Sequence, residues 1–368
     1  MKNIIKISSI LLLFTVFACH YSGTDKKSND VKVGAWYFGG WSFPPDTNGY
    51  TFHISPTLVT QYQEREPVWG WREDQPEIMQ AQIDYAADAG LSFWGFCWYE
   101  NSLVYEPELM DHLNIALDMF LKAPNKNRLD FFLLSCQPVS SVNWEKLCDR
   151  TIACFKEPNY LRVDGKPMIV FFNSDDVISG MGGIEGAKAA FDFFRDKARK
   201  AGVGDIWIGA RTFARGTIPD FQQKYQSCGF DFLTTYNNAD DGRLHTGEND
   251  FANLIAGDKR TWVEITENTT LPFVPVMNVG YDMRPWGDDH PTLPASDYWY
   301  TGVTTERIVA HLRDAIQWVK NNQDKLPDNL LILYAWNENG EGAWLTPTKN
   351  EGNVRLDEVK KIIKEEIK

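Results

Sequence analysis

The sequence lacks the ligand patterns of a transition-metal site. Its 368 residues include only six histidines and six cysteines, with no C-x-x-C pair, no H-E-x-x-H motif and no histidine cluster. No glycine-rich phosphate loop follows the first apolar run either. These absences argue against a transition metal and against a dinucleotide-binding fold. We therefore expect neither a metal nor a cofactor.

Positive charge is also in short supply. The chain has 37 lysines and arginines against 50 aspartates and glutamates, which gives a formal net charge of -13. Such a chain is repelled by polyanions, so we expect no nucleic-acid partner. Aromatic residues, in contrast, are abundant and include 14 tryptophans. Most will pack in the core, but aromatic rings also offer flat apolar faces to sugar rings.

The N-terminal segment indicates export. Lys2 and Lys6 precede an apolar stretch too short to span a bilayer comfortably, and the following "VFAC" resembles the lipobox of bacterial lipoproteins. That resemblance implies a signal peptide over residues 1–18 and lipidation of Cys19. The alternative is an ordinary secretory signal peptide cut nearby. Residues 19–30 are polar and aperiodic, so we expect a flexible tether that anchors the protein to the outer membrane, at its periplasmic face or at the cell surface.

Five cysteines remain after Cys19, and their number is odd. Cys97 and Cys136 lie inside apolar runs, where a thiol behaves as a small hydrophobic group. We expect mostly buried free thiols.

Eight short apolar runs alternate with helical patterns along residues 31–368. They cover residues 32–38, 92–99, 129–136, 167–172, 205–210, 230–236, 271–279 and 329–336. Each run is nearly continuous in hydrophobicity, which is typical of parallel strands covered on both faces. The alternation predicts an α/β fold: a single-domain (β/α)8 TIM barrel. A doubly wound open sheet is the alternative, and the missing phosphate loop disfavours it.

Helical periodicity fills the intervals between the runs. Amphipathic segments include "PEIMQAQIDYAADAG", "EPELMDHLNIALDMFLKA", "VNWEKLCDRTIACFKE", "GAKAAFDFFRDKARKAG", "FQQKYQSCG" and "TTERIVAHLRDAIQWVKNNQ". Gly202 and Gly229 are suitable helix stops. The pattern is weaker around "FANLIAGDKRTWVEIT", before the seventh run.

Polar and aromatic residues follow the ends of the predicted strands. Because the active site of such a barrel lies at the carboxyl ends of its strands, these residues are the candidates for a binding site. Polar groups ringed by aromatic side chains favour a carbohydrate pocket, although some will be ordinary loop residues. The candidates for substrate binding are Trp36, Tyr37, Trp98, Tyr99, Gln137, Asn173, Arg211, Tyr236, Asn278, Tyr281, Trp286 and Asn337.

Glu338 and Glu341 are the candidate catalytic residues. They follow the last apolar run in "LILYAWNENGEG". An E-x-x-E spacing is usually a solvated helix face, but two glycines make this segment a poor helix interior. We therefore expect the pair on a loop at the barrel mouth. Two adjacent carboxyl groups raise the pKa of one of them and so provide a proton donor and a base, as glycoside cleavage requires.

The segment "YAWNENGEGAWLTPT" is similar to the N-E-W-x-E-G segment of glycoside hydrolase family 99 and of the related WbsX-like group. Other pieces agree in order: "GAWYFGGW", "AGLSFWGFCWY", "YLRVDGKPMIVFF", "GFDFLTTY" and "PVMNVGYDMRPW". The resemblance therefore spans nearly the whole chain after the tether. The chain departs from the motif at Asn339, where the family typically has tryptophan.

The resemblance implies a (β/α)8 enzyme that cleaves α-mannosides internally, without a metal and with retention of configuration. It implies that Glu338 acts as a base on the sugar 2-hydroxyl, which attacks the anomeric carbon. Glu341 would then protonate the leaving oxygen and later activate water. The departure at Asn339 leaves the sugar open.

Three functions are compatible with the sequence. The first is an exported, lipid-anchored glycoside hydrolase acting on an oligo- or polysaccharide. The second is a non-catalytic glycan-binding lipoprotein, and the third is a glycosyltransferase-like protein of polysaccharide assembly. The export signal disfavours the third, because nucleotide-sugar donors are cytoplasmic. We expect a monomer that contacts the membrane through its lipid anchor only.

Overall fold

The structure is a computed structural model that describes residues 30–42, 50–51, 53–100, 107–212, 218–286 and 296–367. For residues 107–111 and 218–221 it describes the backbone alone. The predicted signal peptide, Cys19 and all of the predicted tether except Asp30 lie outside the described residues.

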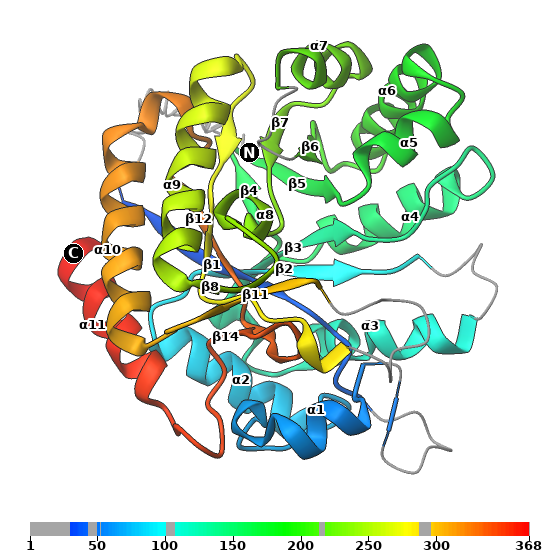
Figure 1. Cartoon of the computed structure of the whole chain (residues 1–368). Coiled ribbons are helices and arrows are strands. Elements are labelled where there is room, and N and C mark those ends of the chain that lie inside the picture. The colour runs from blue at the N-terminus through cyan, green and yellow to red at the C-terminus, as the bar shows by residue number, and fades with distance from the viewer. Residues whose placement is uncertain are drawn as a thin grey trace, which may run out of the picture.

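Nine parallel strand segments form one sheet, in the order β10, β12, β1, β2, β3, β5, β6, β7, β9. Helices surround the strands in Figure 1. The two segments at the ends of this order, β9 (Phe273–Val274) and β10 (Val276–Asn278), are separated in the chain only by Pro275. They are two halves of one strand, interrupted where proline has no N–H to donate. The sheet therefore closes on itself as a barrel of eight strands, and the predicted (β/α)8 fold is confirmed.

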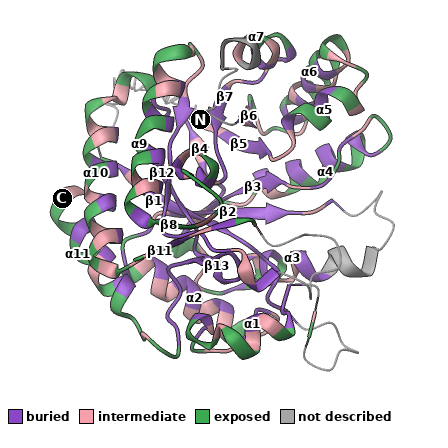
Figure 2. Cartoon of the chain, viewed as in Figure 1, coloured by how far each residue is buried: buried purple, intermediate pink, exposed green. Residues whose placement is uncertain are grey.

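Each predicted apolar run overlaps one strand of the barrel. The other strands are β1 (Lys32–Tyr37), β2 (Phe93–Trp98), β3 (Asp130–Ser135), β5 (Lys166–Phe171), β6 (Trp207–Arg211), β7 (Phe232–Thr234) and β12 (Leu330–Tyr334). Figure 2 shows these strands buried, beneath helices whose outer faces are exposed. Burial on both faces explains why the runs show no polar alternation.

Helices form the outer layer. The long ones are α2 (Pro76–Asp88), α3 (Pro107–Lys122), α4 (Trp144–Phe155), α6 (Ile184–Lys200), α7 (Ile218–Cys228), α9 (Phe251–Asn268), α10 (Thr305–Asn321) and α11 (Val354–Ile367). The weak pattern before the seventh run is α9, whose N-terminus is capped by the Asp250 side chain, 2.7 Å from the Ala252 N–H. Gly202 and Gly229 follow α6 and α7 with φ of 79° and 90°, as helix stops require.

Shorter elements lie between these. They are α1 (Pro56–Gln61), α5 (Ser174–Gly180), α8 (Ala239–Gly242), the 3-10 helices η1 (Gln63–Arg65), η3 (Lys126–Arg128), η4 (Arg284–Trp286) and η5 (Gln323–Lys325), and the strands β4 (Arg162–Val163), β8 (Gly247–Asp250) and β11 (Tyr298–Thr301). Within the described ranges, no helix is long and apolar enough to cross a membrane. The five described cysteines are free thiols, three of them buried, as predicted.

Alternation along the strands decides which side chains reach the barrel interior. In β1, Trp36 packs across the interior on Phe132 of β3, with ring centroids 5.3 Å apart. The next residue, Tyr37, points outward and packs on Trp94 and Phe96 of β2 at 4.9 and 4.6 Å. Neighbouring residues of one strand therefore point to opposite sides of the barrel wall, one into the interior and the next toward the helices.

Candidate active site

The E-x-x-E segment forms a tight turn directly after β12. Glu338 ends the short strand β13 (Asn337–Glu338), which pairs with β14 (Ala343–Trp344), and the 3-10 helix η6 (Asn339–Glu341) joins the two. Gly342 adopts a left-handed φ of 72°, which glycine tolerates without cost. A Cβ on Gly340 would lie 2.6 Å from the Trp286 indole nitrogen. The two glycines that exclude a long helix thus permit this turn.

Glu338 is buried, with 3% of its surface exposed. The Tyr236 hydroxyl donates a hydrogen bond to Glu338 Oε1, whereas the buried Oε2 has no hydrogen-bond partner in the part of the chain that the structure describes. Burial raises the pKa of Glu338 well above its usual value, and the negative charge of Glu341 raises it further. The tyrosine hydrogen bond opposes that rise because it stabilises the carboxylate.

Glu341 is buried to a similar degree, at 8% exposed. The Tyr334 hydroxyl donates to its Oε2, and the Asp282 N–H donates to its backbone carbonyl at 2.6 Å. Burial raises the pKa of Glu341 to about 7, and the hydrogen bond from Tyr334 lowers it. The two carboxyl groups titrate as a pair, so near neutral pH the site holds both a proton donor and a proton acceptor.

Tyr236 joins four parts of the site. Its ring lies 5.9 Å from Trp36, 5.1 Å from Phe172 and 5.1 Å from Tyr334, and its hydroxyl lies 3.5 Å from the Cys97 thiol. These aromatic rings form the apolar layer beneath the carboxyl groups. Strand-end position predicted Trp36 and Tyr236 as site residues. Tyr334 had no such signal because it lies inside an apolar run.

Arg211 ends β6 in the same layer. Its Nε donates to the Phe172 carbonyl at 2.7 Å, and its guanidinium carbon lies 3.9 Å from the centre of the Phe172 ring. Burial lowers the pKa of Arg211 to about 10, so the side chain stays positive at neutral pH. The structure thus places a cation within the aromatic layer.

Some buried polar atoms near the carboxyl ends of the strands have no hydrogen-bond partner among the described residues. They include Trp36 Nε1, on the inner side of β1, and both amide atoms of Gln137, which follows β3. Buried polar groups are nearly always hydrogen-bonded in folded proteins, so unpaired ones indicate positions for water or a hydroxylated ligand. This feature favours Gln137 as a binding residue.

Three other predicted residues, Tyr281, Trp286 and Tyr99, lie near the carboxyl pair or its turn. Tyr281 stacks on Tyr298 at 5.4 Å, donates to Met283 Sδ at 2.8 Å, and has its pKa raised by burial and then by the charge of Glu341. Trp286 lies over the turn, because its indole nitrogen would be 2.6 Å from a Cβ on Gly340. Burial, followed by the charges of nearby groups that include Glu338, raises the pKa of Tyr99. Trp98 is buried at the end of β2, but because its neighbour Cys97 points inward to Tyr236, its side chain leaves the strand on the outer side. Asn173 is half-buried and precedes α5.

Tyr37, Asn278 and Asn337 are not brought to the mouth with the others. The outward-facing Tyr37 donates to Gln82 Oε1 of α2 at 3.2 Å. Asn278 points to α9, where its side chain and its N–H donate to Asp258 at 2.6 and 2.7 Å. The Asn337 amide bonds both backbone groups of Phe38, at 2.6 and 2.7 Å. Strand-end position selected these residues, but their side chains leave the strand on the outer side.

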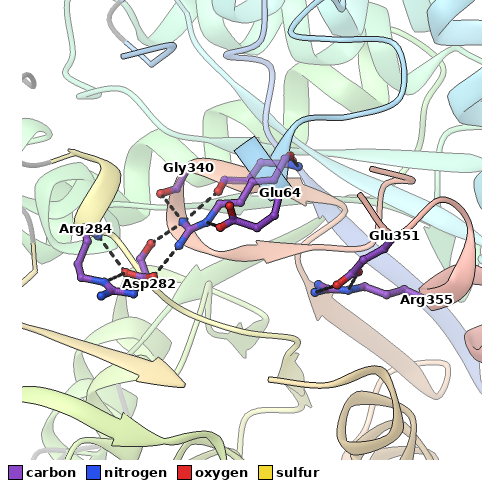
Figure 3. Close-up of polar contacts among 8 residues, drawn as sticks. Glu64, Asp282, Arg284, Gly340, Glu351 and Arg355 are labelled. Carbon is purple, nitrogen blue, oxygen red and sulfur yellow. Dashed lines mark hydrogen bonds and ion pairs between the residues drawn. The ribbon is translucent and has the colours of Figure 1, made fainter. Parts of the chain in front are cut away.

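An arginine that was not predicted as a site residue binds the backbone of the turn. Arg65 is 4% exposed and donates to the carbonyls of Asp282, Asn339 and Gly340 at 3.0, 3.3 and 3.5 Å. It also donates to the Asp282 carboxylate at 2.5 Å, and Arg284 donates to that carboxylate from the other side at 2.8 Å (Figure 3). We call this group, Arg65, Asp282 and Arg284, the turn clamp.

Asn339 belongs to the same buried region. Its side chain is fully buried and donates to the Arg65 carbonyl at 2.7 Å. The position at which the chain departs from the family motif therefore contacts the turn clamp.

The chain belongs to the family described as glycosyltransferase WbsX, whose model matches residues 54–359. The WbsX-like resemblance seen in the sequence is thereby confirmed. No curated protein matches the sequence.

Solved structures share the fold. A protein described as glycoside hydrolase-like is similar with a TM-score of 0.61 and 16% identity, covering 98% of each chain. The GH99 endo-α-mannosidase from Bacteroides thetaiotaomicron is similar with a TM-score of 0.59 and 16% identity, covering 90% of this chain and 96% of that one. A second structure of that enzyme, in complex with bis-tris propane, has a TM-score of 0.58 at the same identity and coverage.

Proposed function

We propose that this protein is a glycoside hydrolase that cleaves an α-linked glycan with retention of configuration. The observation that carries the proposal is the buried pair Glu338 and Glu341, each hydrogen-bonded to a tyrosine and each with a raised pKa. Glycoside cleavage requires one carboxyl group as proton donor and a second as base or nucleophile. The aromatic layer and the unpaired polar atoms suit a sugar ring.

The proposed reaction has two steps. The reactive form is the one in which the proton shared by the pair is on Glu341 rather than on Glu338. Glu338 then accepts the proton of the sugar 2-hydroxyl, whose oxygen attacks the anomeric carbon, while Glu341 gives its proton to the leaving oxygen. Water then opens the resulting 1,2-anhydro sugar: it attacks the anomeric carbon and transfers a proton to Glu341, and Glu338 returns its proton to the sugar O2. Two inversions give net retention. The 2-hydroxyl must lie trans to the leaving group, as in an α-mannoside, which is the substrate class named for the Bacteroides enzyme.

The family description favours a second candidate, transfer of a sugar to a hydroxyl acceptor. The same two carboxyl groups would serve, with an acceptor hydroxyl in place of water. A transferase that uses a nucleotide sugar needs a site for the diphosphate, and the sequence contains no glycine-rich phosphate loop.

A glycan panel tests the proposal. Purified protein is incubated with yeast α-mannan and with plant and host glycans, and NMR identifies the anomer of any product. We expect release of an α-configured product, and a fall of about 10²–10⁴-fold in Glu341→Gln, whose binding of the glycan persists. Glu358→Gln, which changes a half-buried carboxylate of α11 that pairs with Lys361, is the matched control.

Two results would overturn the hydrolase assignment. Binding without cleavage of any glycan would make the protein a glycan-binding protein. Growth of an acceptor chain only when a nucleotide sugar is added would make it a transferase.

We also propose that the protein is exported and anchored by a lipid on Cys19. The lipobox-like "VFAC" supports the proposal. Cys19→Ala should move the protein from the membrane fraction to the soluble exported fraction. An unchanged membrane fraction would contradict lipidation at Cys19.

A further inference from the structure

Glu73 is a buried carboxyl group outside the barrel wall that the proposed chemistry does not use. It lies between η1 and α2, is 1% exposed, and its N–H donates to the Trp41 carbonyl at 2.8 Å. A carboxyl group so far from solvent requires a partner or must remain neutral. Glu73 lies beside β13, the strand that carries Glu338.

Asn337 connects Glu73 to the catalytic pair. Asn337 Nδ2 donates to Glu73 Oε1 at 2.8 Å, and the Asn337 carbonyl accepts from Trp41 Nε1 at 2.7 Å. Asn337 and Glu338 are consecutive residues of β13, so whatever fixes the Asn337 amide also fixes the backbone that carries Glu338. Among the described residues that hydrogen-bond the Asn337 side chain, Glu73 is the ionisable one.

Among the described residues, the side chains that adjoin Glu73 are neutral. They are Tyr37 from β1, Gln82 from α2 and Asn337 from β13. Arg72, the preceding residue, turns to Asp74 at 2.8 Å instead. Glu73 Oε2 is buried beside these groups, and no residue of the described ranges forms a hydrogen bond with it. Burial raises the pKa of Glu73 to about 8, and its charge raises the pKa of Glu338.

We propose that Glu73 is a positioning residue that, while protonated, holds Asn337 and thereby Glu338 in place, and that loss of its proton impairs catalysis in alkaline solution. The inference rests on the proposed hydrolase function. Ionisation of Glu73 places a second buried negative charge near Glu338. That charge keeps Glu338 protonated to higher pH and so removes the base. Glu73 does not touch the substrate in this scheme.

Kinetics on yeast α-mannan separate this role from a merely structural one. Glutamine has the shape of the neutral acid, so Glu73→Gln should keep kcat within about threefold of wild type near pH 6.5. In wild type the fall of kcat above pH 7 should involve two protons, one from the catalytic pair and one from Glu73. In Glu73→Gln it should involve one.

Two further variants complete the comparison. Glu73→Ala removes the anchor of Asn337, so kcat should fall about 10- to 100-fold while KM changes by less than about threefold. Asp74→Asn removes a neighbouring carboxylate that faces Arg72, so its pH profile should match that of wild type. The proposal is overturned if Glu73→Gln loses as much activity as Glu73→Ala, or if its alkaline limb still involves two protons.

Infrared spectroscopy of the ligand-free protein gives a test that needs no turnover. Protonated carboxyl groups absorb apart from carboxylates, so a pH series follows both Glu73 and the catalytic pair. Glu73→Gln should remove one group that titrates near pH 8 and should lower the pH at which the pair loses its proton. An unmoved titration of the pair overturns the inference. An inactive wild type on every glycan overturns the hydrolase function instead.

Discussion

At the scale of single residues, the hydrogen bond from Tyr236 decides how well Glu338 can act as a base. The phenol donates to a carboxylate in a buried site, where an unpaired charge is costly. Tyr236→Phe removes the donor but keeps the ring that packs on Trp36 and Tyr334. The pKa of Glu338 should rise further, so kcat should fall about 10- to 100-fold and its acidic limb should move to higher pH.

Tyr160→Phe is the matched control for this change. The Tyr160 hydroxyl donates to the Met168 carbonyl at 2.8 Å, in an equally buried position between β3 and β5. It should lower thermal stability and leave the pH profile alone. A Tyr236→Phe enzyme with unchanged kcat would remove Tyr236 from the catalytic site.

At the scale of elements, the turn clamp determines where Glu341 lies. Arg65 spans three carbonyls and one carboxylate with its planar guanidinium, which a single ammonium group cannot do. Arg65→Lys should therefore lower kcat about 10- to 100-fold, with KM nearly unchanged, because the turn that carries Glu341 loosens. Steady-state kinetics on the cleaved glycan measure both constants.

Arg195 offers a control with the same chemistry. It lies in α6 and donates to the Gly229 carbonyl at 2.6 Å and to the Asp231 carboxylate at 2.9 Å, none of which belongs to the turn. Arg195→Lys should lower the melting temperature with little effect on kcat. Equal losses of kcat in the two variants would show that the clamp has no special relation to the site.

Strand-end position predicted the site only in part, for reasons that lie in the elements. It selected Trp36, Tyr236 and the two glutamates because each follows or ends a barrel strand. It could not separate Trp36 from Tyr37, since neighbouring strand residues point to opposite faces and the register was unknown. Arg65 is far from the turn in sequence, so contact with the turn became visible only in the folded chain.

At the scale of the whole molecule, the barrel was predictable because its information is local. Each strand is a continuous apolar run, and each long helix has its own amphipathic periodicity. The pattern before the seventh run looked weaker, yet that segment also folds as a helix, α9. Closure of the barrel through the strand split at Pro275 is a long-range property. The apolar run over residues 271–279 did not indicate that its two halves would pair with different strands, β9 with β7 and β10 with β12.

The buried acids predict how the stability of the whole fold depends on pH. Glu73 and Glu341 have folded-state pKa values of about 8 and about 7, against ordinary values near 4.5. The folded protein therefore binds more protons than the unfolded chain between these limits, and stability falls as pH rises from about 4.5 through 8. At about 1.4 kcal/mol per pKa unit, ionisation of Glu73 alone costs up to about 5 kcal/mol.

Thermal unfolding between pH 5 and pH 9 measures this dependence. The melting temperature of wild type should decline across the range, and Glu73→Gln should decline less because glutamine never ionises. Asp74→Asn, which removes a carboxylate paired with Arg72 nearer the surface, should follow wild type. A melting temperature that rises toward pH 9, or equal slopes in wild type and Glu73→Gln, would contradict a neutral Glu73 in the folded state. The same neutral acid that steadies Asn337 at pH 7 is therefore expected to limit the alkaline stability of the barrel.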